Sequence, residues 1–193
     1  INDFIVGYTQ GAEYANPEIK VEKNYVPGEF EDPAGGKECA QALHGSKADI
    51  IFQIAGNSGN GVFEAAQEGG FYAIGVDKDQ KVSAPEFDDV IICSMKKEVG
   101  NSIYDIIKSY IEEDKWDGGK VWLPDMSAGY VGLAYGDENS TQQISDEIKA
   151  EVEELMNKSA IFGSAVENWQ KLAQGRKTII YCSSIEISKS VVD

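Results

Sequence analysis

Short apolar runs alternate with segments of helical periodicity over residues 1–110. Residues 49–55 (DIIFQIA) read as a strand that is buried on both faces, and residues 71–76 and 90–93 form two further runs of this kind. Helical patterns lie between these runs and after the last of them. Strands separated by helices in this way form βαβ units, in which helices cover both faces of a parallel sheet. The sequence therefore predicts an α/β fold with a parallel sheet.

Capping and periodicity predict the remaining elements. Asp3 and Asp32 are suitable N-caps, and Pro33 stands at the first helical position after Asp32. Pro17 ends the first helix and Gly45 ends the second. Alternating polar and apolar residues predict a strand over residues 20–26. Further along we expect helices over residues 62–68, 99–110 and 144–156, a strand over 130–134, a helical segment around Trp169 and a strand over 177–184.

Polar residues follow three of the predicted strands directly. In parallel sheets a ligand binds beyond the carboxyl ends of the strands, and residues 56–61, 77–80 and 94–97 come there. The glycine-rich segment 56–61 could hold a polar ligand with its backbone N–H groups, or it could simply be a tight turn. It lacks the lysine of a phosphate-binding loop, and Glu64 replaces the third glycine of a dinucleotide motif. A nucleotide-phosphate site is therefore not indicated.

Four side chains near this edge have two interpretations each. Asp77 could accept hydrogen bonds from vicinal hydroxyls, or it could cap a turn. One of Lys96 and Lys97 could donate to a ligand oxygen, or both could be surface residues. Phe30 could stack on a planar ligand, or it could pack against the first turn of the helix that Asp32 caps. Spacing does not separate the two alternatives for Phe30. For Asp77, two other polar segments that converge on the same edge favour the ligand role.

Composition excludes several classes of function. The 193 residues carry 17 basic and 33 acidic side chains, a net charge of −16. Such a surface repels nucleic acid and anionic membranes. A hydrophobic share of 42% is that of a folded domain. The three cysteines form neither a disulfide framework nor a metal pattern, and with His44 as the single histidine the sequence gives no support for an enzyme. Cofactor and metal sites are likewise not indicated.

Several segments together resemble the basic membrane protein family, the purine-nucleoside receptor type of solute-binding lipoproteins that serve ABC transporters. The matching words run in order from residue 1 to about 158, and they are specific as a set: GAEYANP (11–17), FEDPAGGK (30–37), ADIIFQIAG (48–56), GNGVFEAA (59–66), AIGVDKDQ (73–80), SMKK (94–97), VGLA (131–134) and ISDEIK (144–149).

This resemblance implies a two-lobed, type I periplasmic-binding-protein-like fold that holds a purine nucleoside in the cleft between its lobes. Residue by residue, Phe30 would stack on the base and Gly56 would line the pocket with its backbone. Asp77 would bind the ribose hydroxyls, and Lys97 rather than Lys96 would complete the ribose contact. The family also implies an ABC transporter permease as partner and membrane anchoring through an upstream lipoprotein signal.

The resemblance covers only the second lobe of that family. We expect residues 1–118 to form the C-terminal ligand-binding lobe, and residues 119–193 to hold crossover segments, a remnant of the N-terminal lobe and an unassigned tail. The chain begins with Ile1, and we expect it to be part of a longer protein whose N-terminal lobe lies upstream. Two alternatives stay open: a ligand-sensing domain of a transcriptional regulator with the same fold, and a nucleosidase-like enzyme.

Overall fold

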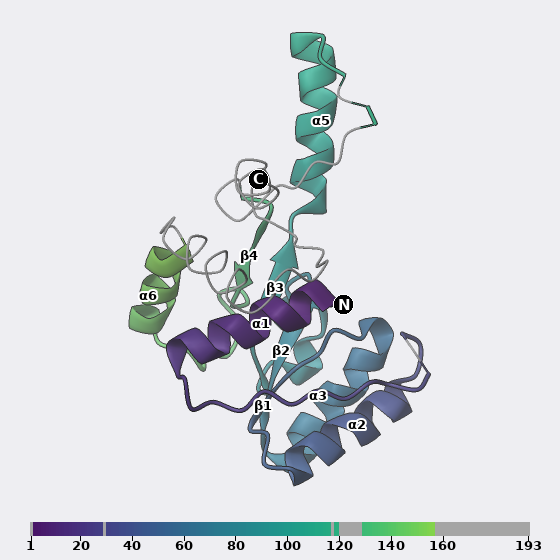
Figure 1. The fold of residues 1–193 in the computed structure, drawn as a ribbon, viewed down its shortest axis with the longest axis vertical. Coiled ribbons are helices and arrows are strands. Elements are labelled where there is room, and N and C mark those ends of the chain that lie inside the picture. The colour runs from purple at the N-terminus through teal and green to yellow at the C-terminus, as the bar shows by residue number, and fades with distance from the viewer. Residues whose placement is uncertain (1, 29, 117, 120–128, 157–193) are drawn as a thin grey trace, which may run out of the picture. The chain divides into compact units, whose positions relative to one another are not determined.

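The computed structural model describes residues 2–28, 30–116, 118–119 and 129–156. These residues fall into two compact units. The first unit comprises residues 1–96 and 133–145, and the second takes the described residues of 97–132 and those from 146 onward. The predicted boundary at residue 118 stays a prediction. The elements, most of which Figure 1 labels, are α1 (Asn2–Ala15), α2 (Pro33–Gly45), β1 (Ile50–Phe52), η1 (Gly56–Ser58), α3 (Gly59–Gly69), β2 (Tyr72–Asp77), α4 (Gln80–Ser83), η2 (Pro85–Phe87), β3 (Ile91–Lys97), α5 (Val99–Glu113), β4 (Val131–Ala134) and α6 (Asp146–Met156).

A four-stranded sheet in the order β1-β2-β3-β4 is the centre of the fold. β1 pairs with β2 in parallel, with Ile51 opposite Ala73, and β2 pairs with β3 in parallel, with Gly75 opposite Ser94. Helices connect these parallel strands, as the alternation of apolar runs and helical segments predicted. The predicted α/β class is therefore confirmed.

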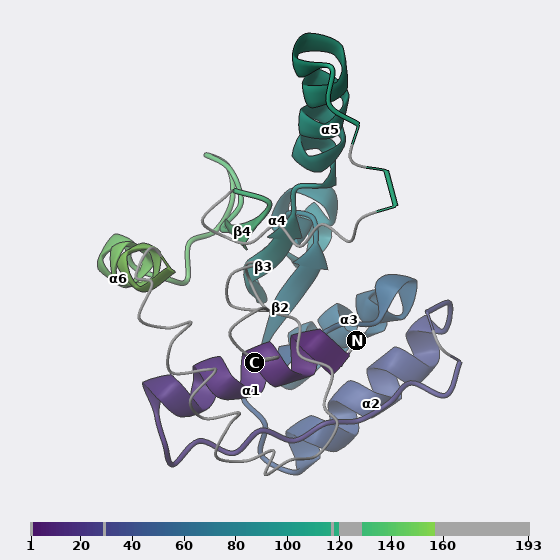
Figure 2. The same cartoon turned by 45° about the horizontal axis from the view of Figure 1, so that its top comes forward.

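Successive residues of β1 show that helices cover both faces of the sheet. Ile51 is 7% exposed and belongs to the core that α2 and α3 form with the sheet. Phe63 of α3 is completely buried in this core. Phe52 points to the other face, where the rings of Phe4 and Tyr8 from α1 lie 6.4 Å and 5.4 Å from its ring. Figure 2 shows α2 and α3 side by side beneath the strands.

The cap predicted for α2 is present. The Asp32 side chain accepts a hydrogen bond of 2.9 Å from the backbone N–H of Gly35, and Pro33 occupies the first turn. A capped first turn satisfies backbone donors that the helix itself leaves without partners. This local signal fixed the start of the helix correctly from the sequence.

Some sequence predictions differ from the structure. Asp3, a predicted N-cap, lies within the first turn of α1, which begins at Asn2, and β1 is shorter than the predicted strand 49–55. Residues 20–26 lie in no strand, although their side chains alternate. No strand of the described residues pairs with them, and most of them are exposed. The short helix α4 was not predicted; Asp79 caps it by accepting a hydrogen bond of 3.1 Å from Lys81 N. The elements expected around Trp169 and over residues 177–184 lie outside the described residues.

The second unit contains α5 and α6. The start of α5 is tied to the residue before β4, because Glu98 N donates a hydrogen bond of 2.8 Å to the carbonyl of Tyr130. The Tyr130 hydroxyl also bonds to the carboxylate of Asp105. No residue of α5 is buried. Its apolar stripe is therefore exposed among the residues that the structure describes.

Candidate functional site

The carboxyl ends of β1, β2 and β3 lie at one edge of the sheet, because the three strands are parallel. Beyond β1 the chain turns at Gly56 into η1, β2 ends at Asp77, and β3 ends at Lys97. The Cα of Asp77 lies opposite that of Lys96 in the register of the two strands. We call this the ligand edge. It brings Gly56, Asp77 and the end of β3 together as the strand pattern predicted.

Phe30 lies against Gly56. Gly56 has a positive φ of 55°, and a Cβ at this position would lie 3.2 Å from the Cβ of Phe30 and 3.3 Å from its Cδ1. Glycine adopts this backbone conformation without strain and lets the aromatic side chain approach the backbone. Phe30 remains 48% exposed. An aromatic ring thus stands beside the end of β1 with much of its surface available for stacking.

Hydrogen bonds fix the loop that carries Phe30 to the same strand end. Ser58 N donates to the carbonyl of Phe30 at 3.1 Å, and Asp32 N donates to the Ser58 hydroxyl at 2.8 Å. The Asn57 amide donates to the Glu31 carboxylate at 3.3 Å. Because Ser58 is fully buried, water does not compete with the two bonds that Ser58 makes, whereas the bond between Asn57 and Glu31 is exposed. The position of Phe30 is therefore set by the fold.

Asp77 occupies an unusual backbone conformation at the end of β2. Its φ is 67°, and the N–H of Lys78 donates to the carbonyl of Val76 at 2.8 Å, so the three residues form a γ-turn. Asp77 is an exposed residue. Strained residues of this kind concentrate at functional sites.

The two lysines at the end of β3 differ in exposure. Lys96 is half-buried and belongs to the first unit, whereas Lys97 is exposed and begins the second. The predicted role of Lys97 in contacting the ligand stays a prediction.

Sequence reasoning missed a buried amide network beneath the ligand edge. Gln53 follows β1, Gln80 begins α4 and Ser94 lies in β3; they are 2%, 7% and 0% exposed. The Gln53 amide donates to Gln80 Oε1 at 2.5 Å, and Gln80 N donates to the Ser94 hydroxyl at 3.0 Å. The available signal was Gln53 itself, a polar residue within an apolar run.

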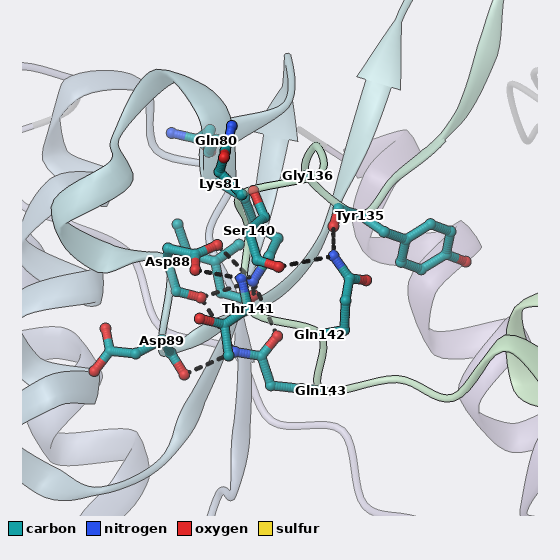
Figure 3. Close-up of polar contacts among 12 residues, drawn as sticks. Gln80, Lys81, Asp88, Asp89, Tyr135, Gly136, Ser140, Thr141, Gln142 and Gln143 are labelled. Atoms are coloured by element: carbon teal, nitrogen blue, oxygen red, sulfur yellow. Dashed lines mark hydrogen bonds and ion pairs between the residues drawn. The ribbon is translucent and has the colours of Figure 1, made fainter.

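A second polar cluster anchors residues 135–143 to the rest of the first unit (Figure 3). The ammonium group of Lys81, a residue 1% exposed, donates to the carbonyl oxygens of Asp88 and Ile91 at 2.7 Å and 2.6 Å. It also bonds to Gln143 Oε1 at 2.9 Å and lies 3.0 Å from Asp88 Oδ1. Buried charges require such partners. The cluster therefore holds the segment after β4 against the sheet.

The carboxylate of Asp88 is the negative partner in this cluster. Burial raises its pKa, but hydrogen bonds from Thr141 and Lys81 and the charge of Lys81 outweigh burial, so the pKa lies below its ordinary value. Thr141 N donates to Asp88 Oδ2 at 2.6 Å. The Asp88 carboxylate is therefore ionised at neutral pH.

The described cysteines and His44 have surroundings that suit a structural role. Burial raises the pKa of the Cys93 thiol to about 11, and burial also raises that of Cys39. His44 stacks on Phe71 at 4.6 Å, and its Nδ1 lies 2.9 Å from the carbonyl of Ala48. Cys182 lies outside the described residues.

Across the part of the chain that the structure describes, no group of three acidic, histidine or cysteine residues could hold a metal ion. Within the same part, no helix is long and apolar enough to cross a membrane.

Comparison with protein families now adds an independent observation. Residues 1–173 match the model of a family described as Bmp, ABC transporter substrate-binding protein PnrA-like. The chain belongs to this family. Among curated relatives, it is 38% identical over 170 residues to "Basic membrane protein D" of Borreliella burgdorferi strain JD1, which covers 87% of this chain and 46% of the relative. It is 32% identical over 173 residues to "Basic membrane protein A" of Borreliella burgdorferi strain ATCC 35210, covering 89% and 50%.

Solved structures share the fold at lower identity. An ABC transporter system solute-binding protein from Aeropyrum pernix K1 matches with a TM-score of 0.57 and 24% identity, over 98% of this chain and 56% of the other. A transcriptional activator of the comK gene from Bacillus halodurans matches with 0.65 and 22%, over 79% and 50%. At these identities the likeness shows the fold alone. The chain spans about half the length of the curated relatives that it matches.

Proposed function

We propose that this chain forms the C-terminal lobe of an extracytoplasmic solute-binding protein that delivers a purine nucleoside to an ABC transporter permease. Membership of the substrate-binding family supports the transport role. The nucleoside is the finer part of the proposal, and it rests on the kinds of side chain at the ligand edge. An aromatic ring suits a planar base, and a carboxylate suits vicinal hydroxyls.

Each residue of the ligand edge has a role in this proposal. Phe30 stacks on the base and the backbone at Gly56 lines the pocket beside it. Asp77 accepts hydrogen bonds from the ribose hydroxyls, and Lys97 donates to a ribose oxygen. No bond of the ligand is made or broken, and no cofactor is needed. The function is binding and release, without catalysis.

The contact between Phe30 and Gly56 carries the proposal. It puts an exposed aromatic ring at the carboxyl end of β1, at the edge of the sheet where the carboxylate of Asp77 ends β2. A stacking surface and a hydroxyl acceptor at one edge of one sheet are the two groups that a nucleoside needs. Neither group alone would favour this ligand class.

A second lobe completes the proposed cleft. Apolar side chains of α5 are exposed, and the curated relatives are about twice as long as the match. We therefore assign residues 1–118 to the C-terminal lobe and residues 119–193 to crossover segments and a remnant of the other lobe, as the sequence suggested. An N-terminal lobe upstream would cover α5 and face the ligand edge, and an upstream lipoprotein signal would anchor the protein to the membrane.

Replacing Asp77 by Asn tests the proposal directly. Adenosine, guanosine and inosine are titrated calorimetrically into a version extended upstream to the length of the relatives. We expect Asp77→Asn to weaken nucleoside binding about 10- to 100-fold, because hydrogen bonds to charged groups contribute about 1.5–3 kcal/mol. Asp49→Asn is the matched control, since this exposed aspartate precedes β1 at the opposite edge of the sheet. Absence of binding heat with all three nucleosides would refute the nucleoside assignment.

The two alternatives predict different results. A regulator would carry a DNA-binding motif in its longer chain; the activator of the comK gene shares 22% identity, which extends to the fold and not to the function. A nucleosidase would consume its substrate. Incubating the extended version with a nucleoside and measuring release of the free base distinguishes binding from turnover.

A further inference from the structure

The γ-turn at Asp77 requires support from its surroundings. A non-glycine residue with a positive φ costs free energy and persists only where the neighbouring structure holds it in place. Asp77 has a φ of 67° and is an exposed residue at the end of its strand. Contacts of the residues on either side of Asp77 contribute to this support.

Gln80 supplies contacts to all three strand ends. Its Oε1 accepts hydrogen bonds from Val76 N at 2.7 Å and from the Gln53 amide at 2.5 Å. Its backbone N–H donates to the Ser94 hydroxyl at 3.0 Å. Val76 is the first residue of the γ-turn. One residue thus connects Gln53 after β1, Val76 of β2 and Ser94 of β3, through its side chain to the first two and through its backbone to the third.

Close packing holds the Gln80 side chain in place. A Cβ at Gly75 would lie 2.8 Å from Gln80 Oε1 and 2.5 Å from the Ser94 hydroxyl. The glycine therefore leaves the room that the amide needs. At 7% exposure Gln80 offers little surface to a ligand, and we expect its effect on a ligand to pass through the turn.

We propose that Gln80 is the positioning residue of the binding site: it holds the γ-turn and so presents the carboxylate of Asp77 to the ligand. The part that concerns the ligand rests on the proposed function. On the far side of the turn, Asp79 Oδ2 accepts a hydrogen bond from Gly136 N at 2.9 Å, which fixes the residue that follows Lys78. The turn is therefore held at both ends.

Amide hydrogen exchange tests the hold on the turn without any ligand. Gln80→Met keeps the length of the side chain and removes the acceptor. We expect the amides of Val76 and Lys78 to exchange about tenfold faster. The Val76 amide loses its acceptor, and the Lys78 amide donates within the γ-turn that this bond holds. Gln67→Met is the matched control. The Gln67 amide donates a hydrogen bond of 2.7 Å to the carbonyl of Glu86, a residue that precedes β3 at the other edge of the sheet. Unchanged exchange at Val76 and Lys78 would overturn the proposal.

Ser94→Ala keeps the test decisive if Gln80→Met does not fold. It removes only the acceptor for Gln80 N and leaves the apolar core as it is. We expect exchange at Val76 and Lys78 to rise about threefold. No rise at either amide would equally overturn the proposal.

A double-mutant cycle separates positioning from a general loss of structure. In the extended version, Gln80→Met is expected to weaken nucleoside binding about tenfold when Asp77 is present and less than about twofold in the Asp77→Asn background. An equal loss in both backgrounds would overturn the positioning role. If the parent protein binds no nucleoside, the proposed function fails, whereas the exchange experiment still decides whether Gln80 holds the turn.

Discussion

Helices α3 and α5 carry apolar stripes of the same helical period, and only the stripe of α3 is buried. Val62, Phe63 and Ala66 of α3 are 5%, 0% and 0% exposed. The stripe of α5 is 44–58% exposed along its length, at Val99, Ile103, Ile106, Ile107 and Tyr110. Periodicity predicted both helices correctly. It did not distinguish the helix that is buried in its own unit from the helix whose stripe is exposed among the described residues.

The difference teaches what an amphipathic pattern contains. It indicates that one face of a helix requires apolar contacts, and it says nothing of where these contacts come from. For α3 they come from α2 and the sheet. For α5, no described residues pack against the stripe closely enough to bury it. The proposed N-terminal lobe would supply them, and substitutions in the two helices test this comparison.

Phe63→Ala is expected to have the largest effect. Removing a fully buried ring leaves a cavity and lowers the free energy of unfolding by about 3–5 kcal/mol. Tyr104→Ala in α5 is the control, because the ring of Tyr104 is 63% exposed; we expect a change within about 0.5 kcal/mol. Urea unfolding of the chain measures both. Similar losses would contradict the contrast between the two helices.

Lys81→Met comes next and extends the comparison to polar contacts. It leaves the Asp88 carboxylate buried without its cation, and breaking such a pair lowers the free energy of unfolding by about 3 kcal/mol. Glu113 is the last residue of α5, and its Oε2 lies 2.8 Å from Nζ of Lys115 in an exposed ion pair. Lys115→Met is therefore expected to cost less than about 1 kcal/mol. Equal losses of unfolding free energy for the two variants, measured in urea, would show that burial does not strengthen the contacts of Lys81.

Ile107→Ser sharpens the comparison at the α5 stripe. In this chain we expect a change within about 0.5 kcal/mol, because Ile107 is 51% exposed. In the version extended to the length of the relatives, the same substitution is expected to cost about 2 kcal/mol, the contribution of an apolar side chain buried at an interface. Lys108→Ser controls for the helix position. An equal, small effect in both versions would show that the upstream lobe does not cover this stripe.

The sequence predicted those parts of the fold that depend on local signals. The Asp32 cap and the apolar runs of β1 to β3 identified their elements, and the parallel order of the strands identified the ligand edge. The strand expected over residues 20–26 was wrong, because pairing depends on a neighbour that is distant in the sequence. A period of two is necessary for a half-buried strand and does not supply that neighbour.

The buried polar residues could not be predicted for a related reason. Gln80 and Lys81 are polar residues in a polar segment, and their burial depends on partners far along the chain. Lys81 bonds to Gln143, which is 62 residues away, and Gln80 bonds to Ser94, which is 14 residues away. Motifs in the sequence predict roles for Phe30, Gly56 and Asp77, and the structure shows the first two in contact. Motifs identified which residues to examine, and only the fold showed what holds them.

The smallest expected effect concerns pH, and it again contrasts the two regions. The pKa of Asp88 is lowered in the folded state, because its hydrogen bonds and the charge of Lys81 outweigh burial, whereas the unfolded chain has the ordinary value of 3.8. A lowered folded pKa contributes stability that is present above the unfolded value and is lost as pH falls through the folded value. The urea midpoints of the parent chain and of Asp88→Asn should therefore converge as pH is lowered from 5 towards 2. A hydrogen bond from Lys115 lowers the pKa of Glu113 as well, but this pair is exposed, so Glu113→Gln should leave the pH dependence unchanged. A constant difference between the parent and Asp88→Asn over this range would mean that the anchor of residues 135–143 does not depend on the Asp88 charge.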